Sequence, residues 1–125
     1  MNLNDFVINN GVLVKYKGPG GTVIIPDGVI SIGSNAFSNC ENLKTIVLSD
    51  NLTSIGNSSF SYCTSLISIK LPNSIEEIGE SAFGNCTNLQ TVSLPDNISE
   101  FNDKIFYSCP NLKFNIYDNG AYLGN

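Results

Sequence analysis

The fold is decided by the stretch Ile32-Gly33-Ser34-Asn35-Ala36-Phe37-Ser38-Asn39-Cys40-Glu41-Asn42-Leu43, because close variants of it return at a fixed interval. Its cysteine, phenylalanine and leucine each recur after 23 residues, three times in succession. The columns are Cys40, Cys63, Cys86 and Cys109; Phe37, Phe60, Phe83 and Phe106; and Leu43, Leu66, Leu89 and Leu112. A fixed internal period is the sequence signature of a protein built by stacking one structural unit.

Four units without insertion cover residues 22–44, 45–67, 68–90 and 91–113. Units of this length are too short for two helices and a turn, which need about 33 residues. The spacing Leu43-x-x-Ile46-x-Leu48 is typical of the strand in a leucine-rich repeat. We therefore predict a solenoid of four right-handed coils, with parallel strands near residues 45–48, 68–71 and 91–94 on one face.

The rest of each unit returns the chain to the next strand. Proline or serine ends the strand, and turn residues follow. Gly33, Gly56 and Gly79 follow an isoleucine, and Asn102 stands at this place in the last unit, so we expect a positive φ there. The next residues, with the pattern Ser-Ala-Phe-x-x-Cys, predict one short helical or 3₁₀ turn. One coil cannot fold alone, but a stack can.

The two ends differ from the repeat. Residues 1–21 are predicted to form a cap, because Asn10-Gly11 between two apolar runs is a strong β-hairpin signal. Such a hairpin would cover the first apolar layer of the solenoid. In residues 114–125 the pattern decays without a clear cap, which suggests a fragment of a longer protein. We treat residues 1–125 as a single leucine-rich repeat domain.

Composition excludes several classes of function. The 125 residues are 42% apolar and 14% charged, which suits a folded domain rather than a disordered chain. The net charge of −5 argues against a nucleic-acid partner. There is no histidine, no nucleotide-binding loop and no paired acid and base, so we expect neither enzyme activity nor a cofactor. No apolar run reaches a membrane span, and the first residues do not resemble a signal peptide.

The cysteine column admits three interpretations. Equivalent residues of adjacent coils lie roughly 5 Å apart, within reach of a disulfide, whereas zinc sites need cysteine pairs two to four residues apart, which the chain lacks. Free cysteine also packs as a small apolar group, and packing alone explains its fixed place, so we prefer buried free thiols.

The row of Asp27, Asp50, Asn73 and Asp96 could hold Ca²⁺. Local turn hydrogen bonds explain this row better, and we predict no metal site.

The repeat resembles the BspA-like, Treponema-type class of bacterial leucine-rich repeats. The matching segments are Val29-Ile30-Ser31-Ile32-Gly33, Asn35-Ala36-Phe37-Ser38-Asn39-Cys40 and Leu43-Lys44-Thr45-Ile46, each recurring in later units. The resemblance covers residues 22–113, although the last unit departs from it at Phe101, Asn102 and Ile105. It implies a surface or secreted protein, in some members an adhesin, that binds a protein or glycan ligand without catalysis.

Outward-pointing side chains of the strands alternate with buried ones and have no structural role. The candidate binding face consists of Lys44, Val47, Ile67, Lys70, Gln90 and Lys113. Half of the basic residues lie in this set, so the sequence predicts a basic strip that favours an acidic partner in a salt-dependent way. The alternative function is a structural spacer in a longer surface protein, with ordinary surface variation along this face.

Overall fold

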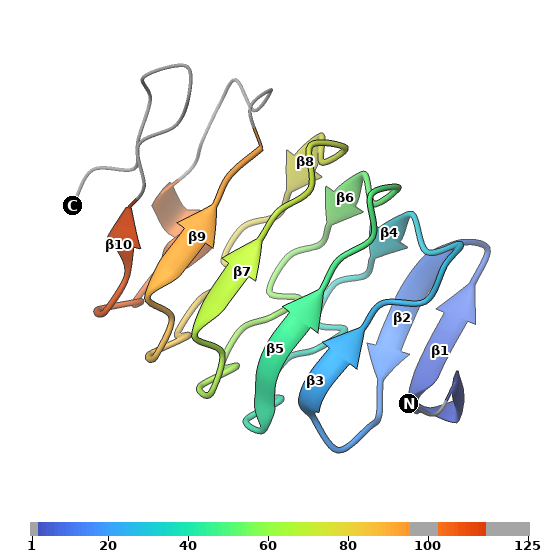
Figure 1. The fold of residues 1–125 in the computed structure, drawn as a ribbon, viewed down its shortest axis with the longest axis horizontal. Helices are drawn as coiled ribbons and strands as arrows, with labels where there is room; N and C mark the ends of the chain where they lie inside the picture. The colour runs from blue at the N-terminus through green and yellow to red at the C-terminus, as the bar shows by residue number, and fades with distance from the viewer. Residues whose placement is uncertain (1–2, 96–102, 115–125) are drawn as a thin grey trace.

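The structure, a computed structural model, describes residues 3–95 and 103–114. Figure 1 shows a stack of coils that begins at the N-terminal hairpin and advances by one coil at a time. One row of strands lies at the front of the stack, and a second row of shorter strands lies behind it (Figure 1). The predicted leucine-rich-repeat solenoid is therefore confirmed.

The front row holds the longer strand of each coil. Its strands are β3 (Gly21–Ile24), β5 (Leu43–Val47), β7 (Ser68–Lys70), β9 (Thr91–Ser93) and β10 (Lys113–Phe114). Every pairing in this row is parallel, as predicted. The central apolar side chains Val23, Ile46, Ile69 and Val92 are buried. Their neighbours on either side point to solvent, because side chains alternate across a strand.

The front row is divided into two sheets after the second coil. β3 pairs with β5, and β7 pairs with β9 and through it with β10. Elsewhere in the row, Ile25 N–H donates to Val47 O at 3.0 Å, and Leu71 N–H donates to Ser93 O at 2.9 Å. No equivalent backbone hydrogen bond joins Leu48 to Lys70, or β5 to β7, within the described residues. The row is thus interrupted between the second and third coils.

A second sheet forms the back of the stack, and the sequence predicted only its hairpin. Its strands, in spatial order, are β1 (Phe6–Asn9), β2 (Val12–Tyr16), β4 (Ser31–Ile32), β6 (Ser54–Ile55) and β8 (Glu77–Ile78). β1 and β2 form the predicted antiparallel hairpin, with φ of 52° at Asn10 and 81° at Gly11. β2 then pairs in parallel with β4. The cap is therefore hydrogen-bonded directly to the first coil.

The glycine column serves close packing, and our expectation of a positive φ there is wrong. Positive φ occurs at other positions of each coil, and Gly33, Gly56 and Gly79 lack it. A Cβ on Gly56 would lie 2.7 Å from the backbone nitrogen of Ser34, and one on Gly79 would overlap the backbone of Asn57. The preceding coil therefore leaves no room for a side chain. Asn102, the fourth member of the column, lies outside the described residues.

The return segment is a run of hydrogen-bonded turns in the first three coils. Ala36 N–H donates to Gly33 O, and Cys40 N–H donates to Phe37 O, both at 3.2 Å. Positive φ at Asn35 and Asn39 interrupts the helical path. Regular 3₁₀ helices occur only at η1 (Leu3–Asp5) and η2 (Asp103–Phe106) among the described residues. The predicted single turn of helix is thus realised as η2 in the last coil and as linked turns before it.

A stack of aromatic rings runs through the core from the cap to the last coil. Its members are Tyr16, Phe37, Phe60, Phe83 and Phe106, with successive ring centroids 4.9, 4.9, 5.1 and 5.5 Å apart. This spacing matches the separation of paired strands, so each coil supplies one ring. The hydroxyl of Tyr16 accepts a hydrogen bond from Gly20 N–H at 2.9 Å. The hairpin thereby supplies the first ring and fixes the entry to the first coil.

Candidate binding surface

All six residues of the candidate binding face are exposed on the front of the solenoid. Lys44 and Val47 lie on β5, and Lys70 lies on β7. The two aliphatic members are about half exposed, at 47% for Val47 and 51% for Ile67. Exposure of this face agrees with the sequence prediction, whereas its role in binding stays a prediction.

These residues form two rows across the coils. The first row lies where the front strands begin and contains Lys44, Ile67, Gln90 and Lys113. The second row lies where the strands end and contains Ile24, Val47, Lys70 and Ser93. Three residues along a strand separate the rows by roughly 10 Å. The lysines are consequently spread over both rows.

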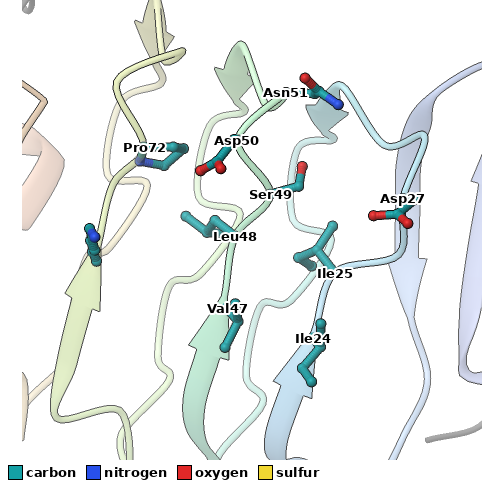
Figure 2. A pocket seen from close by; sticks show the side chains of 10 residues that line it. Ile24, Ile25, Asp27, Val47, Leu48, Ser49, Asp50, Asn51 and Pro72 are labelled. Carbon is teal, nitrogen blue, oxygen red and sulfur yellow. The ribbon is translucent and has the colours of Figure 1, made fainter.

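The second row borders a hollow of about 560 Å³ beyond the ends of β3, β5 and β7. Figure 2 shows Ile24 and Val47 on neighbouring strands at its base, with Asp27, Ser49 and Asp50 on the loops beyond the strand ends. Lys70 and Pro72 complete it from the third coil. Ile24 is 50% exposed, so the base of the hollow is an apolar surface open to solvent.

Both signs of charge meet at this hollow. The side chains of Asp27, Asp50 and Lys70 form no ion pair or hydrogen bond with any other described residue. Asp50 and Lys70 also line a neighbouring hollow of about 480 Å³ on the side of the fourth coil. A ligand with complementary charges would replace water at these groups and break no internal contact. The front face therefore carries both signs of charge, and the preference for an acidic partner stays a prediction.

The cysteine column is a packed ladder of free thiols. Cys63 and Cys86 are fully buried, as predicted, but Cys40 and Cys109 are only partly buried. Cys40 lies beside the open Gly18–Gly20 loop rather than beside a preceding coil. Cys109 belongs to the last described coil. Uniform burial of all four thiols is therefore wrong at the two ends of the ladder.

Each thiol after Cys40 donates a hydrogen bond to the backbone of the preceding coil. The thiols of Cys63, Cys86 and Cys109 donate to the carbonyl oxygens of the phenylalanines in the preceding coil, at 3.3, 3.1 and 3.0 Å. Burial raises the pKa of Cys63 to about 12. The hydrogen bond to Cys109, together with burial, raises the pKa of Cys86. The hydrogen bond with Cys86 instead lowers the pKa of Cys109. Thiols kept protonated are poor nucleophiles, so Cys63 and Cys86 have a structural role.

The acidic row gives no sign of a metal site in the described part of the chain. Asp27, Asp50 and Asn73 are exposed in the turns after the front strands, and Asp96 lies outside the described residues. Across residues 3–95 and 103–114, no three histidine, cysteine or carboxylate side chains converge as metal ligands would. None of the helices in these ranges is long and apolar enough to cross a membrane.

Comparison with known proteins places these observations in a family. Residues 16–125 match the family model of the BspA type leucine rich repeat region, in six copies. A leucine-rich repeat protein from Eubacterium ventriosum is 27% identical over 83% of this chain, with a TM-score of 0.77. One from Bacteroides ovatus is 28% identical over 82% of the chain, with a TM-score of 0.56. No curated protein matches the sequence significantly.

A third structure shares the fold. The leucine-rich repeat protein of T. pallidum is 24% identical over 90% of this chain and 79% of its own, with a TM-score of 0.52. The present chain spans only 28% of the E. ventriosum chain and 33% of the B. ovatus chain. The similarity is therefore to one stretch of each of those two larger proteins.

Proposed function

This chain belongs to the BspA-type leucine-rich repeat family, and on that premise we propose that it is a non-catalytic binding module whose front face holds a protein ligand. The observation that carries the proposal is the set of exposed aliphatic side chains on this face, Ile24, Val47 and Ile67, beside charged groups without internal partners. Exposed apolar area within a polar rim is typical of a protein interaction site. The regular surface of a solenoid suits such recognition.

The chemistry of the front face favours a protein over a glycan. The two exposed rows of this face contain aliphatic, hydroxyl, amide and charged side chains but no aromatic ring. The ligand would place apolar side chains over Ile24 and Val47, a cation near Asp27 and Asp50, and carboxylates near Lys44 and Lys70. Charge complementarity of this kind contributes mainly to specificity and to the association rate.

We further propose that the module acts outside the cell, on the surface of a bacterium or as a secreted protein, in adhesion to host or matrix. Support comes from the family and from the bacterial origin of the similar structures. In this proposal residues 1–21 cap a single domain of four coils. The alternative, a structural spacer, is favoured by one observation, since the chain corresponds to a minor part of the first two similar structures.

Charge reversal on two faces separates these functions. The chain would be immobilised and exposed to extracellular-matrix extract, and captured proteins would be identified by mass spectrometry and titrated individually. Lys44→Glu with Lys70→Glu should weaken binding, while the melting temperature stays nearly unchanged, because surface substitutions usually fall within about ±0.5 kcal/mol. The matched control is Glu76→Lys with Glu80→Lys on exposed residues after the third front strand.

The two outcomes against the proposal are distinct. A module that captures no protein would support the spacer function. Binding that survives the lysine reversal but is lost on reversal of Glu76 and Glu80 would place the interface on the other side of the coil.

A further inference from the structure

The two ends of the cysteine ladder differ in how their thiols meet. Cys40 and Cys109 are both partly buried, and each adjoins a fully buried thiol, Cys63 or Cys86. A side-chain hydrogen bond joins the thiols of Cys86 and Cys109. In the described structure no hydrogen bond of this kind joins Cys40 to Cys63. The end formed by Cys86 and Cys109 is therefore the one where an accessible thiol contacts a buried thiol.

The backbone holds Cys86 and Cys109 side by side. Asn85 N–H donates to Tyr107 O at 2.7 Å, so the third and fourth coils are joined just before the two cysteines. The phenylalanine rings three residues before each cysteine have centroids 5.5 Å apart. Equivalent Cα atoms of neighbouring coils lie about 5 Å apart, within the range of about 4.4–6.8 Å that a disulfide bond requires. A bond between these thiols therefore needs no large movement of the backbone.

The two accessible thiols differ in reactivity. The hydrogen bond with Cys86 lowers the pKa of Cys109, whereas burial raises the pKa of Cys40. The thiolate is the form that attacks a disulfide. Because Cys40 and Cys109 are both partly buried, access alone does not distinguish them. Cys109 is thus the thiol of the ladder best suited to begin an exchange reaction.

We propose that Cys109 is a site of thiol–disulfide exchange with a small-molecule disulfide, and that Cys86 resolves the product to a disulfide bond between the third and fourth coils. With glutathione disulfide, the Cys109 thiolate attacks one sulfur, and the sulfur–sulfur bond of the reagent breaks to release one glutathione thiolate. Cys86 then attacks Sγ of Cys109, and its proton passes to the second departing glutathione. Two protein thiols are oxidised, and one glutathione disulfide is reduced to two glutathione molecules.

The bond would fix the fourth coil to the third. It closes a chain segment of 23 residues, which restricts the unfolded chain and raises stability. Oxidation removes the hydrogen bond from the Cys86 thiol to Phe60 O. That carbonyl keeps a donor, because Cys63 N–H lies 3.3 Å from it. The exchange therefore leaves no unpaired backbone oxygen at Phe60.

The test incubates the full, folded chain with glutathione disulfide at pH 8 and follows the products by mass spectrometry. Free thiols are blocked in denaturant with N-ethylmaleimide, and trypsin then separates the four cysteines by cleaving after Lys44, Lys70 and Lys104. The cross-linked pair of peptides 71–104 and 105–113 should form at least tenfold faster than any product that contains Cys40. The oxidised chain should melt at a higher temperature than the reduced chain, and dithiothreitol should reverse the change.

Two variants separate the attacking thiol from the resolving thiol. Cys86→Ala should stop at the mixed disulfide of Cys109 with glutathione. The matched control, Cys40→Ala with Cys63→Ala, should still form the bond between Cys86 and Cys109. Circular dichroism shows whether each variant is folded, and if either is not, the wild-type peptides decide alone.

The proposal is independent of any ligand at the front face, so its failure would leave the protein-binding function untouched. It is overturned if the wild-type chain forms no bond between Cys86 and Cys109. Products of Cys40 that appear as fast as those of Cys109 would also overturn it, because the contact between the two thiols would then confer no reactivity. A folded Cys86→Ala chain in which Cys109 takes up no glutathione would contradict the assignment of Cys109 as the attacking thiol.

Discussion

Ser59 stands where the preceding coil has Ala36 and the following coil has Ala82, and its buried hydroxyl has no hydrogen-bond partner in the described structure. A buried unsatisfied polar group destabilises a protein by about 1–3 kcal/mol. We therefore expect Ser59→Ala to raise the free energy of unfolding by about 1 kcal/mol or more, as measured by urea denaturation. The matched control is Ser61→Ala, which should destabilise, because the Ser61 hydroxyl donates to Ser58 O at 3.1 Å. A loss of stability in Ser59→Ala would contradict the prediction and indicate a bound water at this hydroxyl.

Substitution of Gly79 tests why glycine is required in this column: for a left-handed backbone conformation or for close packing against the preceding coil. Its φ is not positive, and a Cβ would overlap the backbone of Asn57 in the preceding coil. Overpacking of this kind typically costs about 1–3 kcal/mol. We expect Gly79→Ala and Gly79→Asn to lower stability by similar amounts, as judged by their thermal unfolding. If asparagine were tolerated much better than alanine, a left-handed backbone would be the true requirement.

We expect the protein to lose stability at alkaline pH because of its buried thiols, Cys63 and Cys86. The pKa of Cys63 is raised by burial from near 9 to about 12, so the folded chain retains this proton after the unfolded chain has lost it. The contribution to stability is complete below pH 9 and is lost as the pH rises towards 12. Urea denaturation between pH 7 and pH 11 should show this decline in the free energy of unfolding, and Cys63→Ala should make the decline less steep.

The different burial of the four thiols predicts different rates of reaction. When the folded protein is labelled with a thiol reagent at pH 8, Cys40 and Cys109 should react before Cys63 and Cys86. Equal rates for all four would contradict the difference in burial.

At the scale of the strand, the gap between β5 and β7 leaves one amide without the partner that its equivalents have. Ile25 N–H and Leu71 N–H donate across to the following coil, but no such bond from Leu48 exists in the described structure. We expect the Leu48 amide to exchange its hydrogen faster than those of Ile25 and Leu71 in hydrogen-exchange NMR. Protection of Leu48 equal to theirs would mean that the front sheet is continuous in solution.

The front strands could be predicted because their signal is local. Ile46 and Leu48 lie two residues apart, and this alternation is visible in one coil without knowledge of its neighbours. The back-sheet strands of the coils, β4, β6 and β8, are two residues long, too short for any alternation to show. What identifies them is a contact between coils, such as the hydroxyls of Ser31 and Ser54 at 2.7 Å.

The candidate binding surface could also be predicted only where its signal is local. Exposure of Val47 and Lys70 followed from their place in the strand, but the hollow that joins them to Asp27 and Asp50 depends on how the loops of three coils lie beside one another. The exposed Tyr62 and Tyr107 were not singled out from the sequence, because their positions vary between coils. A signal was available, since Tyr62 occupies a column that otherwise contains only asparagine and serine.

Across the whole molecule, the exposed residues of the front strands and of the return segments occupy different parts of each coil. Val47 and Lys70 lie at the ends of front strands, whereas Tyr62 and Tyr107 lie in return segments about half a coil away in sequence. The same buried columns position both sets. A constant core with variable outer positions lets one scaffold present two unrelated surfaces, and adding coils would lengthen both together.

That organisation predicts that one whole coil can be removed. Each coil packs only on its neighbours, so stability is approximately a sum of coil and interface contributions. Deletion of residues 45–67 joins Lys44 to Ser68 with every column in register, and Phe37 would then stack on Phe83. We expect this shorter chain to fold cooperatively by circular dichroism, with a lower melting temperature. Deletion of residues 45–56 is the control, because it removes a front strand but keeps the following phenylalanine, so that the coil cannot close. If that chain were as stable as the one lacking a whole coil, the 23-residue register would not be what holds the stack together.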